Sequence, residues 1–327
     1  MHVAVIGAGV AGLASAVTLA ERGARVILHE RSASLGGEAA SWLAGGMLAP
    51  FCESESADTA IIGPGLGGIA WWRDRVPDVT TGGTLVLAPP RDAAELDRFA
   101  ARTKGAGSRL DAEGVAALEP QLGGRFRRGL HYPGEAHLDP RRAMEALAER
   151  FVSLGGAMRF SSAADPEMAE GDHVVDCRGI AAGAAGLRSV RGEMLILSSR
   201  EVSLSRPVRL LHPRSPIYVV PRGGGRFMVG ATMIESSDPG GVTLRSAVEL
   251  MNAAYALHPA FAEAEVLEMR AGLRPAFADN LPRVTQAGRV VTLAGLYRHG
   301  FLLAPDCARK AADLILGPEE GPESETP

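Results

Sequence analysis

The sequence predicts an α/β protein in which a discontinuous Rossmann-type domain carries an inserted α+β domain built on an antiparallel sheet. Three observations favour this class. The chain opens with an apolar strand, a glycine-rich turn and an alanine-rich helix; its middle is rich in strand-forming segments; and its end returns to a strand followed by a helix. At 327 residues the chain is long enough for about two domains, since domains commonly contain ~100–200 residues.

The opening strand, residues 3–6, leads into three glycines spaced as GxGxxG. Gly7 permits a tight turn, Gly9 lets the backbone approach a pyrophosphate, and Gly12 lets the helix pack closely against the strand. The motif alone is weak evidence. Small and apolar residues also recur where the helix and the second strand must pack, so the segment predicts a dinucleotide-binding site rather than a chance glycine-rich helix start.

The helix and the second strand supply the rest of this predicted site. Val10 lies in the first helical turn, whose unpaired N–H groups and partial positive charge favour phosphate binding. The second strand, residues 25–29, is followed by Glu30. The carboxylate of Glu30 can accept hydrogen bonds from both hydroxyls of an adenosine ribose.

The loop over residues 31–50 discriminates between cofactors. Four residues separate Arg31 from Gly36-Gly37, an extension that resembles FAD-dependent oxidoreductases of the two-dinucleotide-binding-domain type. It would bring a second flexible backbone segment onto the pyrophosphate. The resemblance implies FAD as cofactor, and we expect the loop to contact it through Arg31, Gly37, Ala40, Ser41, Gly45, Gly46 and Met47.

The next segments predict alternating helices and strands. A helix across 53–75 is expected to be interrupted by GPGLGG, where Gly63, Gly65 and Gly68 repeat the GxGxxG spacing. We interpret this repeat as structural, because it contains Pro64 and no acid ends a later strand. The other expected elements are a strand at 83–88, helices at 92–102 and 111–118 (the latter with an Asp N-cap), a strand with a turn at 129–140, a helix at 140–154 that begins with Pro, and strands at 157–160 and 173–177.

The second half of the chain predicts a sheet and then a return to the first domain. Its clearest element is a hairpin of residues 217–221 and 226–233, which turns on Gly223-Gly224-Gly225. The last helix is expected at 305–316, with Pro305 in its first turn and Asp306 favourable to its dipole. The remaining expected elements are strands at 191–198, 207–212, 265–273 and 289–295 and a helix at 243–257.

These elements predict a division into two domains. The expected FAD-binding domain comprises residues 1–76, 137–188 and 271–317, and the expected substrate-binding domain comprises residues 77–136 and 189–270. Residues 318–327 are expected to form a disordered tail, because this segment is acidic, proline-rich and without apolar periodicity.

Composition argues against several functions. A net charge of −4 gives no basic surface for nucleic acid or for an anionic membrane. The three cysteines are too widely spaced for a disulfide framework or a metal site. No apolar run reaches the ~18–20 residues that a membrane span needs. We therefore expect a cytoplasmic protein without a bound metal.

Several stretches resemble a single family. They are AGGMLAP (44–50), RGEMLIL (191–197), IYVVPR (217–222), VGATM (229–233), AGLRPAFADNLP (271–282) and LYRHGFLLAP (296–305). Together they are similar to the D-amino-acid-oxidase superfamily of FAD-dependent amine oxidases, and most like the glycine oxidases of thiamine biosynthesis. Residues 53–130 and 161–190 match poorly.

The resemblance implies roles in a substrate site. Arg274 would bind the substrate carboxylate, which its planar guanidinium can hold bidentately, and the Tyr218 hydroxyl would hold the same carboxylate. Arg298 would lie beside substrate and flavin, and Met47 and Met233 would line a small pocket. Each residue also has a structural alternative that stays open. Arg274 could pair with a carboxylate in the core, Tyr218 could pack in the sheet, and Arg298 could brace the loop. The two methionines could simply fill the core.

The resemblance also implies that residues 296–302 wrap the isoalloxazine ring, with Arg274 beside it. This segment would bring to the flavin Arg298, His299, Gly300, Phe301 and Leu302. His299 stands where similar proteins carry a small amide, and we expect a neutral imidazole at the surface rather than a base. A helix N-terminus directed at the flavin pyrimidine would stabilise the negative charge that appears there on reduction.

These residues suit the oxidation of an amine better than a lyase reaction, because no carboxylate pair or histidine stands out as a base. The resemblance implies hydride transfer to flavin N5 from Cα of a small amino acid, most simply glycine. Oxygen is the expected electron acceptor, with a quinone or a carrier protein left open. The resemblance implies a homo-oligomer. We expect FAD to be held noncovalently, since no cysteine is placed for attachment.

Two alternatives stay open. The first is another member of the superfamily: an oxidase or dehydrogenase of D-amino acids or N-methyl amino acids, or a tRNA-modifying amine oxidase. The low positive charge argues against the tRNA version. The second is a catalytically silent flavin-binding subunit, against which the presence of Arg274 and Tyr218 argues.

Overall fold

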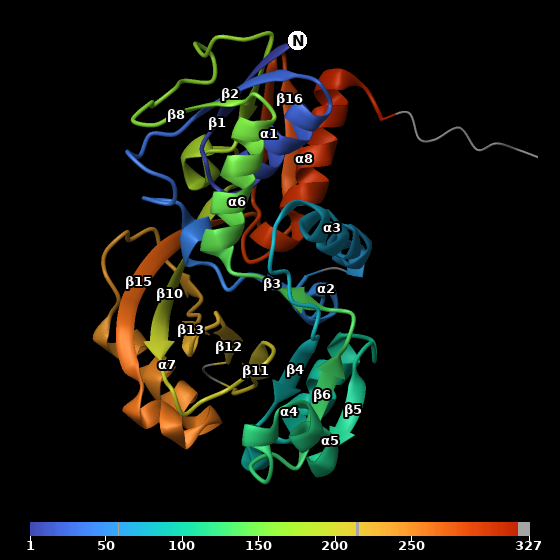
Figure 1. Cartoon of the computed structure of the whole chain (residues 1–327), viewed down its shortest axis with the longest axis vertical. Coiled ribbons are helices and arrows are strands. Elements are labelled where there is room, and N and C mark those ends of the chain that lie inside the picture. Colours follow the sequence, from blue (N-terminus) through green and yellow to red (C-terminus); the bar gives the residue numbers. More distant parts are fainter. Residues whose placement is uncertain (58, 214–215, 320–327) are drawn as a thin grey trace, which may run out of the picture.

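The computed structural model describes residues 1–57, 59–213 and 216–319, and two large β-sheets organise it (Figure 1). The six-stranded sheet lies with several helices at one end of the molecule, and the nine-stranded sheet extends to the other. A two-stranded ladder, β3 (Met47–Leu48) with β7 (Ala136–His137), joins segments that are far apart in the sequence. This architecture confirms the predicted α/β class.

The six-stranded sheet has the order β16-β17-β9-β1-β2-β8, and its neighbours run parallel except for β16 and β17. Counted in chain order, β8, β2, β1, β9 and β17 form the 3-2-1-4-5 arrangement of dinucleotide-binding sheets, with its switch point between β1 and β9. The strands are β1 (His2–Ile6), β2 (Arg25–His29), β8 (Ala157–Arg159), β9 (His173–Asp176), β16 (Arg283–Ala287) and β17 (Val290–Ala294).

The opening turn has the predicted geometry. Gly7 adopts φ +98°, and a Cβ there would lie 2.8 Å from the carbonyl oxygen of Cys177. A Cβ at Gly12 would overlap the carbonyl oxygen of Gly7, so the close packing of helix α1 (Val10–Glu21) on this turn requires glycine. Nearly all of α1 is buried, which its small alanines permit.

The nine-stranded sheet is built on two long strands, β10 (Arg188–Ser198) and β15 (Glu265–Ala276), which pair antiparallel along their length. All of its pairs are antiparallel except β4 with β11. Because β15 crosses the predicted boundary at residue 271, the exact division into domains remains a proposal. The other strands are β4 (Thr84–Leu87), β5 (Ser108–Asp111), β6 (Arg128–Tyr132), β11 (Val208–Leu210), β12 (Ile217–Pro221), β13 (Arg226–Gly230) and β14 (Ile234–Glu235).

Apart from α2 (Pro50–Glu53), which was not predicted, the α-helices follow the predicted order. The predicted N-cap at Asp111 is confirmed, since its side chain accepts a hydrogen bond from the Gly114 amide. Besides α1 and α2, the helices are α3 (Ile62–Arg75), α4 (Ala94–Arg102), α5 (Ala112–Leu118), α6 (Pro140–Ser153), α7 (Leu244–Leu257) and α8 (Gly300–Leu316).

The prediction for 53–75 was wrong in two respects. The helix α3 begins only at Ile62, after a 3-10 turn at Thr59–Ile61, and GPGLGG does not interrupt it but forms its start. The reason is a close crossing of α3 and α8. A Cβ at Gly65 would lie 2.9 Å from the Leu302 side chain, and a Cβ at Gly68 would overlap the Leu302 carbonyl oxygen. The second GxGxxG is therefore a helix-packing feature, as interpreted from the sequence.

The last helix begins at Gly300 rather than 305, so Pro305 lies inside α8. Proline has no N–H to donate to the carbonyl of residue 301. The indole Nε1–H of Trp72 donates to that carbonyl instead, at 2.6 Å, so the carbonyl of Phe301 is paired. Asp306 correspondingly pairs with Lys310 at 2.8 Å, one turn further on, rather than capping the helix.

Four short strands, β3, β5, β14 and β16, were not predicted. Strands β5 and β16 are largely exposed and polar, and β3 and β14 contain two residues each. The predicted disordered tail, 318–327, lies outside the described residues from position 320 onward.

Candidate active site

A cavity of about 390 Å³ runs from the switch point between β1 and β9 to the nine-stranded sheet. Its walls come from the glycine turn, the loop over 38–47, the segment that follows β9, the strands β10, β12 and β15, and residues 293–302. Ligands of open α/β sheets bind at this edge, beyond the carboxyl ends of the strands. The cavity therefore connects a cofactor-binding edge to a second sheet that can hold a substrate.

Most of the predicted site residues line this cavity. They are Gly7, Gly9, Val10, Glu30, Arg31, Ala40, Ser41, Gly45, Gly46, Met47, Tyr218, Arg274, Arg298, Gly300, Phe301 and Leu302. Within the described part of the chain, four others lie outside its lining: Gly12, Gly37, Met233 and His299.

The glycine-turn end of the cavity fits the pyrophosphate and ribose of FAD. Gly9 is the N-cap of α1 and has no side-chain cap, and the first turn contains no acid, so the positive end of the helix faces the cavity. The Val10 amide donates to Ser41 Oγ at 3.1 Å. Glu30 accepts hydrogen bonds from the amides of Ala8 and Ser32, both at 2.8 Å, which orients its carboxylate and leaves lone pairs for hydroxyl donors.

At the other end, Arg274 extends from β15 across the neighbouring strand. A Cβ at Gly192 of β10 would overlap the guanidinium, so the absence of a side chain there makes room for it. The Nη1 atom of Arg274 donates to the carbonyl of Thr232 at 3.0 Å. The other N–H groups of the guanidinium take no part in this hydrogen bond. Burial lowers the pKa of Arg274, but a guanidinium stays protonated at neutral pH.

Tyr218 of β12 is held between two glycines. A Cβ at Gly45 would lie 2.7 Å from its Cε2, and a Cβ at Gly230 would lie 3.2 Å from its hydroxyl oxygen. Larger residues at either position would displace the ring. The loop over 38–47 and β13 thus set where the phenol hydroxyl lies.

Arg298 lies close to Glu53, the last residue of α2, which was not predicted from the sequence as a site residue. Glu53 is 4% exposed and lines the cavity. Its Oε1 forms an ion pair with Arg209 of β11 and lies 3.4 Å from Arg298 Nη2. Burial opposes ionisation of Glu53, but the charges of Arg298 and Arg209 outweigh it and lower its pKa well below the ordinary value.

One signal could have pointed to Glu53. Arg209 is a cation between Val208 and Leu210 in the predicted strand 207–212, and a buried arginine requires an anionic partner. The sequence does not identify that partner, because residues 53 and 209 meet only in the folded chain.

His299 was expected at the surface, and this was wrong: it is 1% exposed. Because α8 begins at Gly300, residue 299 is its N-cap and is enclosed beside α2. Its Nδ1 lies 3.3 Å from Glu53 Oε2 without the alignment of a good hydrogen bond, and its ring meets the edge of Tyr297.

The remaining predicted residues differ in their surroundings. Met47 lines the cavity, whereas Met233 is 48% exposed, with its Sδ 3.2 Å from Arg298 Nη1. Gly37 is exposed. The described residues contain no group of three or more side chains that could hold a metal ion.

The fold and the cavity define the class of α/β proteins that hold a dinucleotide at the switch point of a parallel sheet. Within this class, the chain belongs to the DAO family of FAD-dependent oxidoreductases, whose family model matches residues 2–314. The protein is therefore an FAD-dependent enzyme.

Individual relatives cover nearly the whole chain. A Rhizobium etli protein, provisionally named thiamine biosynthesis oxidoreductase ThiO, is 54% identical over 326 residues, or 99% of each chain. A Bacillus licheniformis protein named glycine oxidase is 30% identical over 357 residues, or 96% of this chain and 92% of the relative. The crystal structure of glycine oxidase from Geobacillus kaustophilus, 24% identical, superposes with a TM-score of 0.84 over 97% of this chain and 95% of that one, which supports the fold.

Proposed function

We propose that this enzyme oxidises a small amino acid, glycine first, and that it serves the synthesis of the thiamine thiazole. Loss of a hydride from Cα and of a proton from the amine leaves iminoacetate, which water converts to glyoxylate and ammonia. Oxygen takes the two electrons and two protons and becomes hydrogen peroxide. The observation that carries the proposal is the pair Arg274 and Tyr218, both lining one cavity with the cofactor-binding turn. The names of the Rhizobium and Bacillus relatives support the choice of substrate.

Arg274 and Tyr218 suit a carboxylate. The guanidinium carries five N–H donors in a planar fork, and only the Nη1 bond to Thr232 occupies it among the contacts above. A carboxylate can therefore be held bidentately by the arginine and receive a further hydrogen bond from the phenol. Fixing an amino acid in this way orients its Cα, and orientation of this kind contributes several kcal/mol to catalysis.

FAD, when bound, supplies a two-electron acceptor that takes hydride at N5. The chain contributes the electrostatic environment. The N-terminus of α8 lines the cavity through Gly300, Phe301 and Leu302, so its positive dipole end favours negative charge there. His299 does not line the cavity, which supports a reaction without a histidine base at that position.

Because the second GxGxxG has a packing role, one dinucleotide motif remains, and FAD would occupy it. No second motif is then left for a nicotinamide cofactor, which supports oxygen as the acceptor. A cytoplasmic location is supported by the three cysteines, all buried and free. In the described part of the chain, no helix is long and apolar enough to cross a membrane.

A homo-oligomer is supported by exposed apolar side chains along one face of α7, which a second copy would cover. They are Leu244, Val248, Met251 and Tyr255. Sedimentation of the holoenzyme tests this: a monomer at micromolar concentration would contradict it.

The variant Arg274→Ala tests the proposed function. Loss of one bidentate charged contact should cost about 2–4 kcal/mol in the transition state, so kcat/KM for glycine should fall about 30- to 1,000-fold while FAD stays bound. Unchanged turnover of glycine would refute the assignment. Faster oxidation of D-alanine, D-proline or sarcosine than of glycine by the wild type would identify another substrate, and no reduction by any amine would indicate a silent subunit.

A further inference from the structure

The motif Arg191-Gly192-Glu193 in β10 uses both faces of the strand. Successive side chains of a strand point to opposite faces, so Gly192 lies on the face where Arg274 crosses the strand, and its two neighbours lie on the other. On that other face, Arg191 is 3% exposed and Glu193 is 0% exposed. Arg191 Nε and Nη2 donate to Glu193 Oε1 at 3.0 and 2.8 Å.

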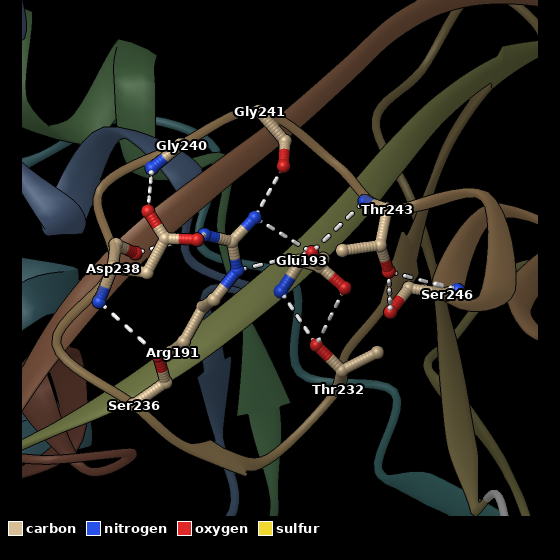
Figure 2. Close-up of polar contacts among 9 residues, drawn as sticks. All are labelled: Arg191, Glu193, Thr232, Ser236, Asp238, Gly240, Gly241, Thr243 and Ser246. Carbon is tan, nitrogen blue, oxygen red and sulfur yellow. Dashed lines mark hydrogen bonds and ion pairs between the residues drawn. The ribbon is translucent and has the colours of Figure 1, made fainter.

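A buried ion pair is weak evidence for stability, because desolvation of the charges offsets their attraction. The contacts of this pair indicate that it fixes the conformation of a neighbouring loop. The connection between β13 and α7, residues 231–243, curves around the guanidinium (Figure 2). Arg191 donates to the carbonyls of Asp238, at 2.8 Å, and Gly241, and the Thr243 amide donates to Glu193 Oε1 at 3.2 Å.

Thr232 joins the ion pair to the opposite face of the strand. The Glu193 amide donates to Thr232 Oγ1 at 2.9 Å, the hydroxyl lies 3.4 Å from Glu193 Oε2, and the Thr232 amide donates to the Glu193 carbonyl at 3.2 Å. The Thr232 carbonyl accepts the Nη1 hydrogen bond of Arg274. The next residue, Met233, contacts Arg298.

We propose that Arg191 and Glu193 are positioning residues that fix the connection 231–243 and, through Thr232, orient the guanidinium of Arg274 toward the substrate carboxylate. This inference rests on the proposed function of Arg274. The ion pair lies outside the cavity, so it acts on the substrate only through the connection.

Acetate is a suitable probe, because it carries the carboxylate of the substrate without an amine to be oxidised. Its dissociation constant is measured by the change in flavin absorbance of the holoenzyme, with FAD content determined in parallel. Glu193→Gln and Thr232→Val should each weaken acetate binding about tenfold without loss of FAD. Thr232→Ser, which keeps the hydroxyl, should bind acetate as the wild type does.

One control separates positioning from general loosening. Leu250→Ala removes a buried side chain of α7 and destabilises the same region without touching the ion pair. Its acetate affinity should stay within twofold of the wild type.

The proposal is overturned if Thr232→Val binds acetate within twofold of the wild type, or if Leu250→Ala weakens binding as much as Thr232→Val does. If Glu193→Gln fails to fold, the Thr232 pair of variants decides the question alone. Failure of the proposed function has a different signature: Arg274→Ala would then bind acetate as tightly as the wild type.

Discussion

A methyl group at residue 192 is the sharpest perturbation of the carboxylate site that this structure offers. In Gly192→Ala, the new Cβ would overlap Cζ, Nη1 and Nη2 of Arg274. Ordinary contacts between heavy atoms need ~3.5–4.0 Å, so the guanidinium must move by about 1 Å or more. That movement strains its 3.0 Å hydrogen bond to the Thr232 carbonyl. A displacement of ~1 Å in a positioning group can lower the rate about 100-fold, or about 2.7 kcal/mol.

The assay is steady-state oxidation of glycine, with flavin absorbance as the measure of bound FAD. Gly272→Ala is the matched control, because Gly272 pairs with Gly192 across β10 and β15 and also lines the cavity. A Cβ there would lie 3.1 Å from the movable end of Leu43 and no closer than 3.8 Å to Ala40. We expect Gly272→Ala to lower kcat/KM less than fivefold. The reasoning is refuted if Gly192→Ala, with FAD bound, stays within threefold of the wild type or if both variants lose the same activity.

Three further predictions concern the buried core and the cofactor. Glu135 is buried and accepts a hydrogen bond from the Cys52 amide at 2.6 Å. Burial raises its pKa to about 7, so its stabilising contribution is complete below pH ~4.5 and is lost as the pH rises through 7. The variant Glu135→Gln should therefore gain up to about 3 kcal/mol in unfolding free energy relative to the wild type between pH 4.5 and 8, and equal pH slopes would contradict this. Trp72→Phe should cost about 1–3 kcal/mol by leaving the Phe301 carbonyl unpaired, and Pro305→Ala should restore most of that loss in the double variant; additive effects would argue against this account. Acid precipitation should release all of the yellow colour from the protein, whereas colour in the pellet would indicate covalent FAD.

Local patterns predicted the elements whose geometry depends on neighbours in the sequence. The glycine turn before α1 is an example, because its spacing already implies the tight turn and the close helix packing. The start of α8 could not be predicted in this way. A proline one turn inside a helix is acceptable only because Trp72, more than two hundred residues earlier, donates to the carbonyl that the proline leaves unpaired. The strands β5 and β16 lie at the surface, so most of their side chains are polar, and they show no apolar pattern from which a strand could be predicted.

Some residues of the candidate site could likewise be predicted from local sequence, whereas others depend on contacts between distant segments. Arg274 and Tyr218 lie in stretches that resemble a known family, and the structure brings both to one cavity. Glu53 and the burial of His299 depend on contacts between α2, β11 and the start of α8, which no local pattern encodes. The roles of Gly45 and Gly192 as gaps for larger side chains likewise became apparent only in three dimensions.

The central claim is that the cavity containing Arg274 and Tyr218 oxidises glycine. The most direct test is anaerobic addition of glycine to the purified holoenzyme while the flavin absorbance band is followed. The account predicts rapid bleaching that air reverses, with hydrogen peroxide appearing in proportion to the flavin reoxidised. A flavin band that stays unchanged with glycine, in a protein that carries a full complement of FAD, would contradict the claim.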